Sequence, residues 1–285
     1  MGYNAGMDVQ EITKNLNQEQ RTAVTHEAGP LLIVAGAGTG KTTVITQRIA
    51  WLILSGKAKP EEILAVTFTE KAAAEMAERV DQLLPYGYVD LWISTFHSFG
   101  EKLLKRHGLD IGLPNDFRVY DQTAQWLMVR EHLDEFKLEY YRPLGNPTKF
   151  IHALLGHFSR AKDESIWPAD YAAYARKLHP KKKSHGQTKP VAGDLAALET
   201  QRIDEVAQAY QTYQQLLLGK NALDFGDLIN YTVKLLTERP AILAQYRQQF
   251  KYLLVDEFQD TNWAQYQLIK MLAAPANNVT VVGDD

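Results

Sequence analysis

The segment Leu31–Thr43, with the sequence Leu-Leu-Ile-Val-Ala-Gly-Ala-Gly-Thr-Gly-Lys-Thr-Thr, decides the fold. Its first four residues are apolar, as in a buried strand, and the apolar spacing from Thr43 to Leu54 predicts a helix. Small residues between a strand and a helix let backbone N–H groups close on phosphate oxygens, and the helix N-terminus adds the positive end of its dipole. The segment therefore predicts the phosphate-binding loop of an NTPase.

Within this loop each residue type has an expected task. Lys41 is expected to reach the β- and γ-phosphates of ATP, and the Thr42 hydroxyl to ligate Mg²⁺. A glutamine amide both donates and accepts hydrogen bonds, so Gln20, upstream of the loop, is a candidate for reading the adenine edge or is simply a solvated helix residue. The predicted ATP-binding residues are Gln20, Ala35, Gly36, Ala37, Gly38, Thr39, Gly40, Lys41, Thr42 and Thr43.

Four further stretches have the apolar character of buried strands. They are Ile63–Thr67, Leu91–Ser94, Phe250–Val255 and a last strand with its loop within Asn278–Asp285. A helix-forming stretch follows the first and the third of them, and such alternation predicts an α/β domain with a parallel sheet and right-handed crossovers. Ligands of these sheets gather at the carboxyl ends of the strands, where the phosphate loop also begins.

The pair Asp256–Glu257 ends one of these strands and completes a predicted hydrolytic site. Asp256 is expected to hold Mg²⁺, directly or through water, opposite Thr42. Glu257 is expected to polarise the attacking water as general base. The metal would neutralise the charge that develops on the phosphates.

Two other strand ends carry hydroxyls next to aromatic rings: Thr67-Phe68-Thr69 and Thr95-Phe96-His97. Hydroxyls bind phosphates and rings stack on bases, which is how single strands are held without sequence preference. These six residues are predicted to bind DNA; the alternative is that the rings pack in the core and that the histidine is structural. No second ligand stands at metal spacing from His97.

Composition and charge narrow the function classes. The 285 residues carry a net charge of −3 and include no cysteine, which excludes disulfides, thiolate metal sites and a cysteine nucleophile. Neither a signal peptide nor an apolar run of membrane-spanning length is present, so a cytoplasmic protein without membrane contact is expected.

The segment from Lys137 to Lys189 is basic, with eleven Lys and Arg against four Asp and Glu. Its aromatic residues are Tyr140, Tyr141, Phe150, Phe158, Trp167, Tyr171 and Tyr174. Charge and rings together are compatible with a nucleic-acid surface, although some rings must belong to the core. The Lys181–Lys183 loop within it is either solvated or in contact with a DNA backbone.

From about Glu101 the sequence loses its strand candidates and becomes helical. The expected helices are Gln122–Leu138, Thr148–Lys162, Ala169–Leu178 and Asp194–Leu218. A second, mainly α-helical region is therefore predicted between the two halves of the parallel sheet.

Seven segments occur in the order of the motifs of superfamily 1 helicases. They are Gln20, Ala35–Thr42, Thr67–Met76, Thr95–Phe99, Leu223–Leu228, Val255–Asn262 and Val281–Asp285. They resemble the UvrD/Rep/PcrA branch over nearly the whole chain. The resemblance implies a RecA-like P-loop NTPase domain formed by residues 1–100 and 246–285, interrupted by an inserted, mainly α-helical domain of residues 101–245.

The same resemblance implies an ATP-dependent 3′–5′ DNA helicase that moves on single-stranded DNA and unwinds duplex DNA. Gln20 would contact adenine, Gln259 would couple nucleotide state to DNA, and Phe68 with Thr95–His97 would contact the single strand. Two positions depart from relatives: Glu70 stands where many have Asn, and Thr43 replaces a basic residue found in some. The inserted domain of relatives approaches duplex DNA, which favours the basic segment as a contact surface.

The chain ends within the last of these motifs, and relatives supply arginine fingers from a second RecA-like domain. We therefore expect this polypeptide to be a monomer that binds nucleotide weakly and hydrolyses ATP negligibly by itself, within a longer enzyme that meets repair or replication proteins. Three alternatives stay open at this stage: a phosphate-loop kinase or other small-molecule NTPase, a non-catalytic helicase-like binding module, and a helicase fused to a nuclease.

Overall fold

The computed structural model describes residues 9–36, 38–84, 91–178 and 195–284, and the chain divides into two compact units. Unit 1 is Met1–Ile111 with Thr232–Asp285, and unit 2 is Gly112–Tyr231. Both boundaries differ from the expected 100/101 and 245/246. The first boundary lies later because α5 (Phe96–His107) belongs to unit 1: the Phe99 ring meets Trp92 of the sheet and Phe250, each with ring centroids 6.1 Å apart.

Unit 1 is built on a five-stranded sheet with all neighbours parallel. Its strands are β1 (Leu31–Val34), β2 (Ile63–Thr67), β3 (Trp92–Thr95), β6 (Tyr252–Val255) and β7 (Val279–Gly283), in the order β1-β7-β6-β2-β3. The predicted α/β fold with a parallel sheet is confirmed. The register pairs Val34 with Gly283 and Thr67 with Thr95, so the carboxyl ends of strands far apart in sequence meet at one edge.

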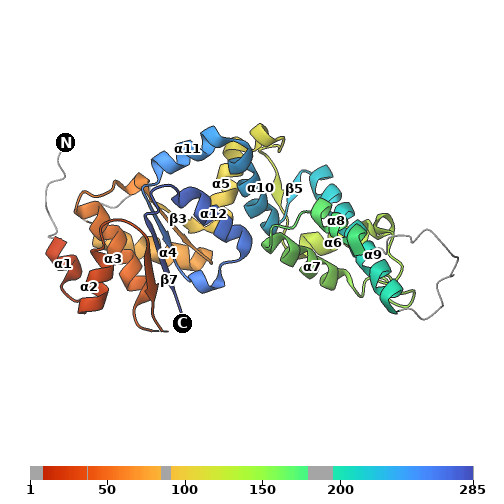
Figure 1. Ribbon diagram of the computed structural model, residues 1–285, viewed down its shortest axis with the longest axis horizontal. Coiled ribbons are helices and arrows are strands. Elements are labelled where there is room, and N and C mark those ends of the chain that lie inside the picture. Colours follow the sequence, from red (N-terminus) through yellow and green to blue (C-terminus); the bar gives the residue numbers. More distant parts are fainter. Residues whose placement is uncertain (1–8, 37, 85–90, 179–194, 285) are drawn as a thin grey trace. The chain divides into compact units, whose positions relative to one another are not determined.

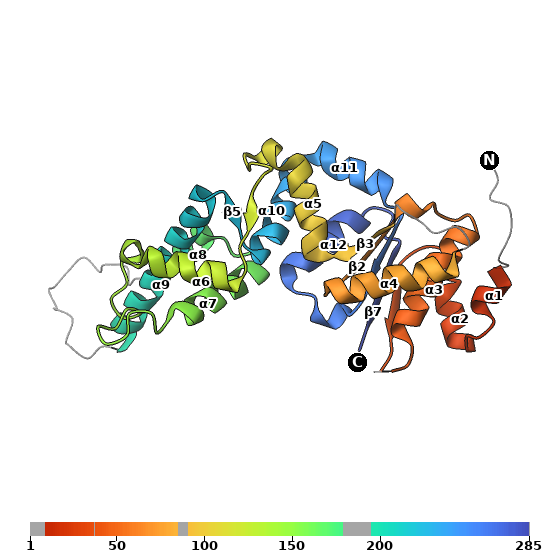
Figure 2. The ribbon, with the colours of Figure 1, turned by 180° about the vertical axis from the view of Figure 1, so that it is seen from behind.

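Helices cover both faces of this sheet. The helices of unit 1 are α1 (Val9–Thr13), α2 (Gln18–Val24), α3 (Lys41–Leu54), α4 (Glu70–Leu83), α5, α11 (Pro240–Gln249) and α12 (Trp263–Ala273), with 3₁₀ turns η1 (Pro60–Glu62), η2 (Gly108–Ile111) and η4 (Phe258–Asp260). A buried cluster joins α3 and α4 to alternate residues of the strands, including Ala65 and Leu254. Figure 2 shows α4 crossing in front of the sheet. Figure 1, which views the protein from the opposite side, shows α12 in front of the sheet.

A buried arginine ties this layer together. The Arg48 side chain of α3 is 1% exposed, and its Nε donates to the Thr280 hydroxyl of β7 at 2.9 Å. Its Nη1 donates to the carbonyls of Ala23, Val24 and His26 at 3.1, 3.1 and 2.6 Å. Burial lowers the pKa of Arg48 to about 10, so it is charged at neutral pH. It therefore holds the end of α2 against the helix that follows the phosphate loop.

Unit 2 is mainly helical, as expected. Its elements are α6 (Gln122–Glu131), η3 (Leu133–Phe136), α7 (Ile151–Asp163), α8 (Pro168–Leu178), α9 (Leu195–Gly219) and the first part of α10 (Phe225–Glu238). The helix expected over 122–138 ends at Glu131, because the chain turns through η3 to Lys137, whose φ of 47° is left-handed. The strands β4 (Arg118–Val119) and β5 (Ala222–Leu223), which pair in parallel, were not expected, since two residues show no apolar alternation.

A buried ionic cluster lies inside unit 2. The Lys162 Nζ is 2.6 Å from Asp224 Oδ2 and 2.9 Å from Asp227 Oδ1, and all three side chains are almost fully buried. The Tyr213 hydroxyl donates to Asp224 at 2.8 Å, and Gln214 donates to Asp227 at 3.1 Å. A Cβ at position 226 would lie 2.8 Å from Lys162 Cβ, so glycine is required between the two aspartates.

Among the described parts of the chain, every helix is too short or too polar to cross a lipid bilayer.

Candidate nucleotide site and DNA-contact edge

The phosphate loop joins β1 to α3 with two glycines in left-handed conformation, Gly38 at φ 77° and Gly40 at φ 93°. The Ala35 N–H donates to the Gly283 carbonyl at 3.1 Å, and the Thr39 hydroxyl donates to the Gly36 carbonyl at 2.7 Å. Gly40 caps α3 without a side chain, which leaves the first N–H groups of the helix open to an anion. The expected loop residue Ala37 lies outside the described residues.

Gln20 lies directly against this loop. Its Nε2 donates to the Thr39 carbonyl at 3.1 Å, while its Oε1 accepts from the Asn17 N–H at 3.2 Å in a capping box at the start of α2. A Cβ at Gly40 would lie 3.3 Å from Gln20 Nε2. The side chain is therefore held beside the loop and not solvated at random.

A pocket of about 350 Å³ opens between α2, β1 and the loop. It is lined by Asn17, Glu19, Gln20, Ala23, Ile33, Val34, Ala35, Thr39, Lys41 and Val44. Apolar strand and helix residues form one wall, and the polar lining residues are Asn17, Glu19, Gln20, Thr39 and Lys41. That combination suits a flat ring with an attached anion.

Lys41 is held by an acid at the end of β7. Its Nζ forms an ion pair with Asp284 Oδ1. The Asp284 N–H in turn donates to Gln259 Oε1 at 3.1 Å, and Gln259 Nε2 donates to Glu257 Oε2 at 2.8 Å. A continuous polar chain therefore runs from the loop lysine to the candidate general base.

Asp256 and Glu257 follow β6 at the same edge. Asp256 is buried, its N–H donates to the Val66 carbonyl at 3.0 Å, and its Oδ1 accepts from the Glu257 N–H at 3.1 Å. Burial and then the charge of Glu257 raise the pKa of Asp256, against opposing effects from the Glu257 N–H and Lys41. Glu257 has a left-handed φ of 51°, a strained conformation for a non-glycine residue that is often found at functional sites.

The close approach of Gln259 to β7 explains the glycine at position 283. A Cβ there would lie 2.8 Å from Gln259 Oε1 and 3.4 Å from its backbone N. Because real contacts of a Cβ are longer, any side chain at 283 would push Gln259 away from Asp284. The glycine thus permits the link between β7 and the turn after β6.

The donor set at this edge fits Mg²⁺ better than a tightly bound structural metal. Among the described residues, no three His, Cys, Asp or Glu side chains gather closely enough to hold an ion. Mg²⁺ is usually held by one or two protein oxygens together with phosphates and water. Asp256, with its raised pKa, is a carboxylate that a cation would stabilise in the ionised form.

The predicted DNA contacts at the ends of β2 and β3 divide into two groups. Phe68 and His97 are half-buried and Thr69 is exposed, whereas Thr67, Thr95 and Phe96 are buried. The Phe96 ring is 2% exposed and packs edge-on against Phe68 at 6.1 Å. The Phe96 ring is therefore enclosed by protein in this structure, because α5 begins at this residue and turns the ring inward. The Thr67 hydroxyl is likewise enclosed by protein.

Both helices that follow these strands are capped by threonines that were predicted to bind DNA. Thr69 caps α4 by accepting from the Ala72 N–H at 3.1 Å, and Thr95 caps α5 by accepting from the Ser98 N–H at 3.0 Å. Glu70, the first residue of α4, reaches across to the hydroxyls of Thr95 and Ser98 at 2.7 and 2.5 Å. The start of α5 is thus covered by a carboxylate.

In unit 2 the basic, aromatic segment is only partly a surface. Phe158 is 1% exposed and stacks on Tyr210 at 4.9 Å, so it belongs to the core. Tyr140 and Tyr174 are exposed, and Arg202 lies over the Tyr140 ring at 3.9 Å. The Lys181–Lys183 loop lies outside the described residues.

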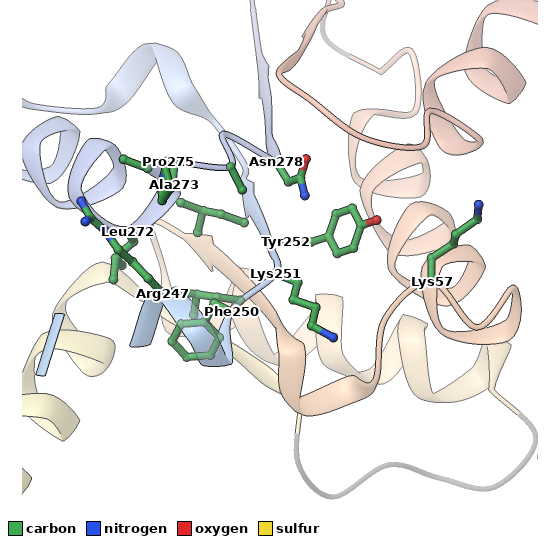
Figure 3. A pocket seen from close by; sticks show the side chains of 13 residues that line it. Lys57, Arg247, Phe250, Lys251, Tyr252, Leu272, Ala273, Pro275 and Asn278 are labelled. Atoms are coloured by element: carbon green, nitrogen blue, oxygen red, sulfur yellow. The ribbon is translucent and has the colours of Figure 1, made fainter. Parts of the chain in front are cut away.

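A second pocket, of about 200 Å³, lies at the amino-terminal ends of the strands (Figure 3). Its three cations are already bonded within the protein. Lys57 pairs with Glu27 at 3.0 Å, Lys251 pairs with Glu62 at 2.7 Å, and the Arg247 Nε donates to the Met271 carbonyl at 2.7 Å. This pocket is therefore a poor candidate for an anion site.

Three groups near the sites were not assigned from the sequence. Asp284 pairs with Lys41, and Glu70 accepts hydrogen bonds at the start of α5. Both contacts join segments that are distant in the chain, and sequence periodicity does not reveal such contacts. Arg48 lies in α3, the helix after the phosphate loop, and its side chain is on the buried, apolar face of that helix. A cation on the buried face of a helix is the one signal that marks it.

The chain matches known proteins over nearly all its length. Residues 16–285 match the family model described as the UvrD/REP helicase N-terminal domain. The chain is 40% identical over 281 residues to the ATP-dependent DNA helicase PcrA of Leuconostoc citreum, covering 98% of this chain and 33% of that protein. It is 40% identical over 275 residues to PcrA of Bacillus subtilis, with coverages of 96% and 33%.

A third relative is DNA helicase II of Haemophilus influenzae, 36% identical over 283 residues, with 98% of this chain and 35% of that protein covered. The chain thus spans about a third of the length of these relatives. The matched segment includes the phosphate loop, the Asp256–Glu257 pair and both strand ends with hydroxyls. The chain belongs to the UvrD/REP helicase family, of which it carries the N-terminal domain.

Proposed function

We propose that this chain is the N-terminal, nucleotide-binding part of an ATP-dependent DNA helicase that moves 3′ to 5′ on single-stranded DNA and unwinds duplex DNA. The observation that carries the proposal is the polar chain Lys41–Asp284–Gln259–Glu257 at the edge of the sheet where the phosphate loop begins. It links the group expected to bind the γ-phosphate with the group expected to activate water. Support also comes from relatives named as ATP-dependent DNA helicases.

In this proposal ATP enters the pocket beside the phosphate loop. Gln20 orients adenine, and the open N–H groups of the loop and of α3 receive the phosphates. Lys41 leaves Asp284 and binds the β- and γ-phosphates. The Gly38 and Gly40 conformations keep the backbone free of side chains where the phosphates approach.

Thr42 and Asp256 would hold Mg²⁺, which supplies charge neutralisation on the phosphate oxygens when bound. Glu257 accepts a proton from the attacking water, and the Gln259 amide donates to its carboxylate at 2.8 Å. Gln259 contacts both Glu257 and the Asp284 N–H, so a movement of Lys41 and Asp284 reaches the general base through it.

Single-stranded DNA would pass the adjoining strand ends. Thr69 is exposed and offers a hydroxyl to phosphate, while Phe68 and His97 are half-buried rings beside it. Tyr140, Tyr174 and the basic residues of unit 2 are the proposed contact with duplex DNA. Repair or replication proteins are the proposed protein partners.

The relatives are about three times as long as this chain, and NTPases of this type complete their site with arginine fingers worth about 10³–10⁵ in rate. We therefore expect the 285 residues to behave as a monomer that binds ATP weakly and turns it over negligibly.

The test is ATP turnover by a chain extended to the length of its relatives, with and without single-stranded DNA. DNA should stimulate turnover, and Lys41→Ala should abolish it. Turnover that is independent of DNA would contradict the proposal in favour of a small-molecule NTPase. If Lys41→Ala turned over ATP as fast as the wild type, the assignment of the nucleotide site would be wrong.

A further inference from the structure

The start of α5 already holds an anion that belongs to the protein itself. Glu70 is the first residue of α4, and Thr95 and Ser98 lie at the start of α5. The strands before these helices, β2 and β3, are neighbours with Thr67 paired to Thr95. The parallel register therefore brings the two helix starts side by side at the carboxyl edge of the sheet.

The contact occupies both hydroxyl donors at the start of α5. Glu70 Oε1 accepts from the Thr95 hydroxyl at 2.7 Å and from the Ser98 hydroxyl at 2.5 Å. A hydroxyl has a single O–H to donate, so neither group can donate to a second acceptor at the same time. Thr95 also accepts the Ser98 N–H, so its remaining capacity is small.

The carboxylate is ionised in this position. Hydrogen bonds from Ser98 and then Thr95, with a smaller contribution from His97, lower the pKa of Glu70 despite partial desolvation. A negative charge at a helix N-terminus is favourable, for the same reason that a phosphate is favourable there. Glu70 thus has the charge, the acceptor atoms and the location of a bound phosphate.

We propose that Glu70 is an internal substitute for a DNA phosphate, which single-stranded DNA must displace or avoid at the start of α5, so that it weakens strand binding at this edge. The inference rests on the proposed function, because it takes the strand to pass the ends of β2 and β3. It adds a residue that limits affinity there.

Two substitutions separate the charge of Glu70 from its hydrogen bonds. Glu70→Gln keeps an oxygen that can accept from Thr95 and Ser98 but removes the charge. Glu70→Ala removes both and frees the two hydroxyls. If the carboxylate competes with phosphate, the affinity for single-stranded DNA rises about three-fold in Glu70→Gln and about ten-fold in Glu70→Ala.

The salt dependence of binding gives a readout that a purely structural role would not move. Either substitution removes one negative charge from the protein surface that faces the strand. Binding should then release more counterions, so the slope of log K against log salt becomes steeper by about 0.7. The matched control is Glu78→Gln, which removes the same charge from an exposed position further along α4. It should leave both affinity and slope near wild type.

The experiment titrates a fluorescein-labelled oligothymidylate with the 285-residue chain by fluorescence anisotropy at several salt concentrations. Thermal unfolding of each variant establishes that it is folded. Tighter binding in the order Ala, Gln, wild type, with steeper slopes, supports the proposal. Unchanged or weaker binding of folded Glu70→Ala overturns it while leaving the DNA-binding proposal intact. Absence of salt-dependent binding in all variants, Glu70→Ala included, overturns both.

Discussion

Lys41 and Asp284 form an ion pair across the nucleotide site, between the helix that follows the phosphate loop and the residue after β7. The lysine side chain is 10% exposed and the aspartate side chain is 41% exposed. A lysine expected to bind phosphate is therefore held by a protein carboxylate in this structure. Nucleotide must replace that carboxylate when it binds.

Asp284→Asn should tighten nucleotide binding, because ATP then no longer competes with a charge for Lys41. Partly exposed ion pairs contribute about 0.2–1 kcal/mol, so the gain should reach at most about five-fold. Titration with a fluorescent ATP analogue measures it. The matched control is Glu27→Gln, which breaks the Lys57–Glu27 pair away from the site and should change nothing. Weaker binding by Asp284→Asn would show that the acid assists nucleotide instead of competing with it.

Gly40→Ala should impair both folding and nucleotide binding. The residue has φ 93°, where a side chain is strained, and its Cβ would lie 3.3 Å from Gln20 Nε2. We expect a loss of about 1–3 kcal/mol of stability, together with weaker binding because Gln20 is displaced. Thermal unfolding and the same nucleotide titration measure the two effects.

Gly56→Ala provides the comparison, since Gly56 has φ 67° and no atom within 4 Å of its Cβ position. It should lose stability through backbone strain alone and keep its nucleotide affinity. Equal loss of affinity in both variants would mean that Gln20 has no part in the effect.

Local patterns predicted the sheet and the loop well, because each depends on residues adjacent in sequence. The run Ile63–Thr67 is β2 to the residue. What the sequence could not reveal are contacts made by the register. Glu70 reaches Thr95 and Lys41 reaches Asp284 only because parallel strands align their ends.

The aromatic residues show the same limit. Phe68 and Phe96 stand in nearly identical sequence contexts, yet Phe96 is buried and Phe68 is half-buried. The difference arises where the helices begin. α5 starts at Phe96 itself, whereas α4 starts two residues after Phe68.

The buried cluster of unit 2 predicts a pH-dependent difference between two substitutions. Burial and then the charge of Asp224 raise the pKa of Asp227 to about 6, although Lys162 opposes this. Burial would also raise the pKa of Asp224, but the charge and hydrogen bond of Lys162 outweigh burial and lower it. The two acids therefore contribute to stability in opposite directions as pH changes.

The folded pKa of Asp227 lies above its unfolded value, so wild type loses stability as pH rises from about 4 through 6. Asp227→Asn escapes that loss, and its destabilisation relative to wild type should be smaller at pH 8 than at pH 5. Asp224→Asn removes the acid that stays ionised beside Lys162 and should cost about 3 kcal/mol at pH 8. Urea unfolding at both pH values measures the differences. A larger cost of Asp227→Asn at pH 8 than at pH 5 would contradict the assignment.

Asp256→Asn should stabilise the metal-free protein while damaging its nucleotide site. The raised pKa means that the ionised carboxylate is less favourable in the folded protein than in the unfolded chain. Stability is therefore lost as pH rises through that pKa, and at pH 8 the wild type carries the full cost. Because Asn is neutral and its oxygen can still accept the Glu257 N–H, we expect a gain of about 0.5–2 kcal/mol in the free energy of unfolding.

The functional half of the same prediction uses Mg²⁺. If Asp256 holds the metal, wild type should bind an ATP analogue more tightly with Mg²⁺ than with EDTA, and Asp256→Asn should lose that difference. Asp260→Asn is the matched control, because it removes a neighbouring carboxylate from the same turn. Within this turn, that carboxylate accepts a hydrogen bond only from the Gln259 amide, at 3.4 Å. It should keep the Mg²⁺ effect and gain no stability. A less stable Asp256→Asn at pH 8 without metal would mean that Lys41 already compensates the buried charge, and that the acid is structural before it is catalytic.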